Sequence, residues 1–111
     1  MKTIESTNQK YIFERVLIEA ENLQEYLEIG EMNTTKILYL LQNLKFSIWH
    51  AEASENRQYQ TELYVILKEY RWIINVLEER VVLNKKNYTI SSISSTFIAM
   101  NEPFAKIIDN M

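Results

Sequence analysis

The 111-residue chain contains a single glycine, Gly30, and a single proline, Pro103. Sandwiches and barrels of β-strands need many turns, and those turns draw heavily on glycine and proline. The scarcity of both residues therefore favours a few long helices. It also excludes a glycine-rich phosphate-binding loop and the dinucleotide-binding fingerprint, because each needs several glycines at fixed spacing.

The longest amphipathic stretch runs from Tyr59 to Leu83, YQTELYVILKEYRWIINVLEERVVL. A first line of apolar and aromatic residues recurs there at alternating steps of four and three, which a helix produces and a strand does not. This line consists of Tyr59, Leu63, Ile66, Tyr70, Ile73 and Leu77. We expect it to pack into the protein core.

A second apolar line follows the same stretch and consists of Val65, Trp72, Val76 and Leu83. A surface helix needs only one apolar stripe, so two interpretations stand. Neighbouring helices cover both lines inside a bundle, or the second line meets another protein. Because Tyr, Trp and Arg are enriched at protein interfaces, the second interpretation predicts the partner-binding residues Trp72, Val65, Val76, Tyr64 and Arg71, followed by Trp49 and Tyr39.

Two more long helices are expected before this stretch. The first covers about residues 7–29 and ends at Gly30, since glycine commonly adopts the left-handed conformation just past a helix. The second covers about residues 34–52 and opens after Asn33, a favourable cap. Its main stripe is Ile37, Leu41, Leu44 and Ile48, and a second line is Tyr39, Phe46 and Trp49.

The boundary between the second and third helices is weakly marked. The polar joint from His50 to Gln58 contains no glycine or proline, and Ser54 or Asn56 is the expected cap of a third helix over about residues 56–83. The alternative is one continuous helix over about residues 34–83. A helix of that length without internal caps implies a coiled coil and a dimer.

The C-terminal region changes texture at residues 88–96, which are rich in Ser and Thr and poor in helix propensity. We expect a short extended piece there, or a lead-in capped by Ser91 or Ser92, before a short helix over about residues 92–100. Asn101 and Pro103 suit the cap and first turn of another short helix over about residues 103–110.

Together these elements predict an all-α fold. It is a small, mostly antiparallel helical bundle of three long helices plus a short C-terminal helical segment, forming a single domain over residues 1–111. Hydrophobic residues make up 47% of the chain and charged residues 24%, which is ordinary for a globular domain.

No pattern in the chain predicts catalysis, a cofactor or a metal site. The absence of cysteine excludes disulfides, thiolate ligands and a cysteine nucleophile. The single histidine, His50, has only Glu52 and Glu55 nearby, short of a typical zinc site. No nucleophile elbow surrounds the serines of residues 91–95. We therefore expect a protein that is not an enzyme.

The chain is acidic, with a formal net charge of −3, whereas nucleic-acid binders usually carry a basic stripe. Arg80, Lys85 and Lys86 form one small basic patch, which leaves a transcription-type regulator as the weakest alternative. The apolar runs are too short to span a membrane, and the two glycosylation sequons, at Asn33 and Asn87, suit caps or turns. We expect a cytoplasmic protein that binds neither nucleic acid nor membranes.

The remaining hypothesis is a protein-binding module that acts by occupying the surface of a partner protein. Inhibitors, immunity-type proteins, secretion chaperones and phage-borne antagonists are often small helical proteins of this kind. The inference concerns the class of protein and not a particular family. The alternative is a self-assembling structural protein, a homodimer closed by the second line of the central helix.

Overall fold

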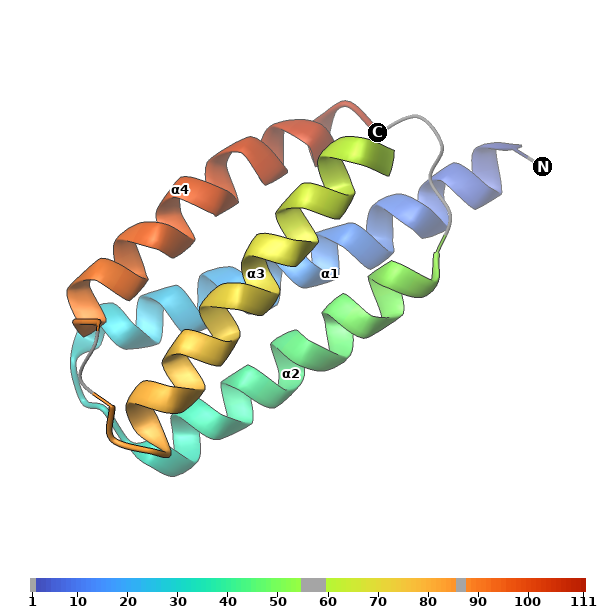
Figure 1. The fold of residues 1–111 in the computed structure, drawn as a ribbon. Helices are drawn as coiled ribbons and strands as arrows, with labels where there is room; N and C mark the ends of the chain where they lie inside the picture. The colour runs from blue at the N-terminus through green and yellow to red at the C-terminus, as the bar shows by residue number, and fades with distance from the viewer. Residues whose placement is uncertain (1, 55–59, 86–87) are drawn as a thin grey trace.

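The computed structural model describes residues 2–54, 60–85 and 88–111, with side chains from residue 10 onward except at residue 60. Within these residues, four antiparallel helices form a bundle: α1 (Lys2–Ile29), α2 (Thr34–Ala53), α3 (Gln60–Val81) and α4 (Ile90–Asp109). Each helix packs on the next along the chain, and α1 also packs on α4 (Figure 1). The described residues include no strand, so the predicted all-α class is confirmed.

All four helices contribute to one core. Aromatic rings occupy its centre, where the Tyr70 ring lies 5.7 Å from that of Phe104 and 6.3 Å from that of Phe97. Phe13 of α1 meets Phe104 edge-on at 6.4 Å. The predicted first line of α3 is confirmed as its core-facing stripe: Leu63, Tyr70, Ile73 and Leu77 are buried and Ile66 is half-buried, while Tyr59 lies outside the described residues.

A buried polar network links three helices through this core. The Tyr70 hydroxyl donates to Oδ1 of Asn101 at 2.6 Å, and Nδ2 of Asn101 donates to Oε1 of Gln24 at 2.9 Å. Burial, with a smaller contribution from the Glu21 carboxylate, raises the pKa of Tyr70 well above its ordinary range. The hydroxyl therefore remains protonated at neutral pH and can donate its hydrogen bond. The two hydrogen bonds of the network connect α3 to α4 and α4 to α1.

The end of α1 and the start of α2 follow the expected signals. Gly30 adopts a left-handed conformation with φ of +81°, and the Asn33 side chain accepts from the backbone N–H of Lys36 as the cap of α2. The helix ends at Ala53, because the extended backbone of Ser54 turns the chain out of the helix.

The alternative of one continuous helix over residues 34–83 is wrong. The helix α2 ends at Ala53, and α3 returns antiparallel to it (Figure 1). Ser54, a predicted cap of the third helix, instead closes α2: its N–H and its Oγ both donate to the Ala51 carbonyl. The predicted start of the third helix at residue 56 and the other predicted cap, Asn56, lie outside the described residues.

The predicted pair of short C-terminal helices is wrong, because α4 is one long helix. Its cap is Thr89, whose Oγ1 accepts from the backbone N–H of Ser92, so neither Ser91 nor Ser92 has that role. Asn101 is buried inside the helix and Pro103 is exposed within it. One buried face continues through both positions: Ile93, Phe97, Met100, Phe104 and Ile108. Its burial outweighs the backbone hydrogen bond that proline removes.

Two bounds also shift from the sequence prediction. The helix α1 begins at Lys2, ahead of the expected residue 7, and α3 ends at Val81, ahead of the expected residue 83. Four long helices therefore replace three long helices and a short segment. Across the described residues, none of the four combines the length and apolar character needed to cross a membrane.

Candidate protein-binding surface

All the predicted partner-binding residues except Val76 are exposed on the bundle. Tyr39 and Trp49 lie on α2, and Tyr64, Val65, Arg71 and Trp72 lie on α3. Val76 is only 8% exposed and belongs to the core. The second line of α3 is therefore divided: Val65, Trp72 and Leu83 remain accessible, while Val76 packs inside.

The exposed residues of α3 lie along two different edges of the helix. Arg71 forms an ion pair with Glu52 on α2, and Tyr64 precedes it by two helical turns on the same edge. Trp72 instead meets Tyr88, which leads into α4, edge-on at 5.8 Å. Val65 lies two turns before Trp72 on that edge. The structure does not bring these two pairs into one compact patch.

The largest aromatic exposure lies on α2. Tyr39, Phe46 and Trp49 are 59%, 62% and 66% exposed, and they form what we call the α2 aromatic face. They project away from the bundle because the opposite side of the helix holds the buried Ile37, Leu41, Leu44 and Ile48. The Phe46 and Trp49 rings lie 5.9 Å apart. Phe46 was absent from the predicted set, although its spacing from Tyr39 and Trp49 placed it on their line.

A groove between α1 and α2, here the α1–α2 groove, borders this face. Tyr11 of α1 and Tyr39 and Phe46 of α2 provide its aromatic lining. Tyr11, 64% exposed, also lay outside the predicted set, because it stands alone before the apolar stripe of α1.

Polar groups also line this groove, and three of them have internal partners. Arg15 contacts the largely buried Glu19 carboxylate at 2.8 Å, and the Ser47 hydroxyl donates to the Asn43 carbonyl at 3.0 Å. A buried carboxylate needs such a counter-charge. Gln42, Asn43 and His50 also line the groove, so it offers polar as well as aromatic surface.

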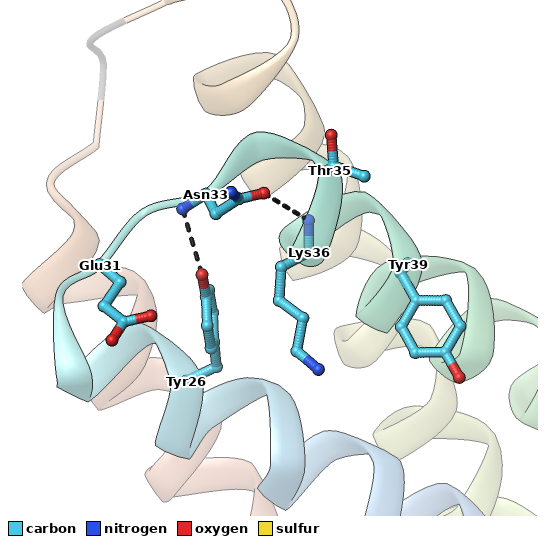
Figure 2. A pocket seen from close by; sticks show the side chains of 6 residues that line it. All are labelled: Tyr26, Glu31, Asn33, Thr35, Lys36 and Tyr39. Carbon is cyan, nitrogen blue, oxygen red and sulfur yellow. Dashed lines mark hydrogen bonds between the residues drawn. The ribbon is translucent and has the colours of Figure 1, made fainter.

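A second hollow lies at the start of α2, where the Lys36 side chain extends between Tyr26 and Tyr39 (Figure 2), and Tyr39 lines both this hollow and the groove. The Tyr26 hydroxyl accepts from the backbone N–H of Asn33 at 3.2 Å. The Lys36 ammonium lies 5.7 Å from the centre of the Tyr39 ring, within cation–π range. Glu31 and Thr35 complete the lining.

A smaller cleft separates α2 from α3 and brings two predicted residues together. Trp49 and Arg71 both line it, above Ile48 and Ile74. Two ion pairs span the helices at this cleft, Lys45 with Glu78 and Arg71 with Glu52. Partly exposed pairs of this kind contribute about 0–1 kcal/mol each. The cleft is therefore defined mainly by the packing of the helices.

The structure gathers no metal-binding cluster: within the described ranges, no group of three or more His, Asp or Glu residues lies close enough to hold an ion. His50 is exposed on the lining of the α1–α2 groove. Of the predicted basic patch, Arg80 is half-buried with Nε lacking a hydrogen-bond partner, Lys85 is exposed, and Lys86 lies outside the described residues.

The fold and the exposed residues define a small antiparallel four-helix bundle with an aromatic outer face on α2. No known protein family, no curated protein and no solved structure matches this chain.

Proposed function

We propose that this protein is a non-enzymatic binding module that occupies the surface of a partner protein. It acts as an inhibitor, an immunity-type protein, a chaperone-like protein or a phage-type antagonist, in the cytoplasm and without nucleic acid or membrane as a partner. The supporting observation is the α2 aromatic face, which the other three helices leave uncovered.

The size of this face, taken together with the neighbouring Tyr11 of α1, supports the proposal. A fully covered aromatic side chain buries about 150–250 Å², and Tyr11, Tyr39, Phe46 and Trp49 are 64%, 59%, 62% and 66% exposed. Covering all four removes roughly 400–600 Å² from water. That lies within the range of the largest apolar patch of an ordinary monomer, about 300–600 Å², and supplies about half to three-quarters of the ~800 Å² that each partner contributes to a standard interface.

The alternative function is a self-assembling homodimer closed by α3. Its supporting observation is the accessible part of the second line, where Val65, Trp72 and Leu83 are 51%, 46% and 60% exposed. A two-fold contact through this line brings the same residues of both copies together.

Site-specific photo-crosslinking in the source cell tests the function. A photoreactive phenylalanine analogue replaces Trp49 on the α2 aromatic face, Trp72 on α3 or the exposed Glu25 on α1, in separate chains. We expect one discrete adduct with a foreign protein from position 49 and none from Glu25, the control position.

Two results would contradict the binding-module function. An adduct from position 72 at twice the 13.3 kDa chain mass, with none from position 49, supports the homodimer instead. The absence of any adduct from both positions, in chains that remain folded by circular dichroism, removes both functions.

A further inference from the structure

We draw no further inference here: the strongest candidate, the α1–α2 groove beside the α2 aromatic face, has a mixed aromatic and polar lining, and nothing in the structure shows what covers it.

Discussion

Removing the Tyr70 hydroxyl should lower the free energy of unfolding, because it leaves a buried acceptor without its hydrogen-bond donor. The hydroxyl donates to Oδ1 of Asn101, and both side chains are buried, at 0% and 6% exposed. In Tyr70→Phe the Asn101 oxygen keeps its burial and loses its donor. A buried polar group stranded in this way costs about 1–3 kcal/mol, a large share of the ~5–15 kcal/mol by which domains are stable.

The partner variant, Asn101→Leu, strands the Tyr70 hydroxyl instead and should cost a similar amount. When both changes are combined, no polar group of this pair is left unsatisfied. We therefore expect the double variant to lose about 1–2 kcal/mol less than the sum of the single variants.

Urea unfolding followed by circular dichroism measures all four chains, with the midpoint and slope fitted together. Tyr64→Phe is the matched control, because Tyr64 is 66% exposed and its change should stay within about 0.5 kcal/mol. If the losses of the two single variants add up to the loss of the double variant within about 0.5 kcal/mol, Tyr70 and Asn101 are not energetically coupled and the reasoning is refuted.

Three further predictions concern the backbone and pH. Gly30→Ala should cost about 1–2 kcal/mol in urea unfolding, because φ is +81° and no atom lies within 4 Å of the added Cβ; a neutral result would contradict this. Pro103→Ala should raise the free energy of unfolding by about 1–3 kcal/mol, and a loss of stability would show that proline is needed there. Above about pH 10, Tyr70 ionises only in the unfolded chain, so unfolding becomes easier by about 1.4 kcal/mol per pH unit. Urea titrations should show Tyr70→Phe lacking this part of the slope, and parallel slopes would contradict the raised pKa.

Periodic apolar spacing was sufficient to predict α1, α2 and α3 and most of the core. Leu63, Tyr70, Ile73 and Leu77 are buried as their spacing indicated, because residues three and four apart share one face of a helix. Local signals were weaker in α4, where the Ser-rich stretch and Pro103 indicated breaks. Burial of Phe97 and Phe104 on either side of Asn101 overrides those local preferences.

The candidate surface was less predictable, because exposure depends on where neighbouring helices lie. Val65 and Val76 share one line of α3, yet Val65 is 51% exposed and Val76 is 8% exposed. Nothing in the local sequence distinguishes them. Tyr11 reaches the α1–α2 groove from a different helix than Tyr39, so only the packing of α1 on α2 reveals that they share a site.

The solution mass across a concentration series distinguishes a foreign partner from self-association, since a foreign partner requires that the exposed aromatic residues are not used between copies of the chain. Light scattering should give 13.3 kDa at every concentration, the mass of a monomer with its α2 aromatic face free. A mass of twice that value, independent of concentration, would contradict the account and assign the exposed apolar surface to a homodimer.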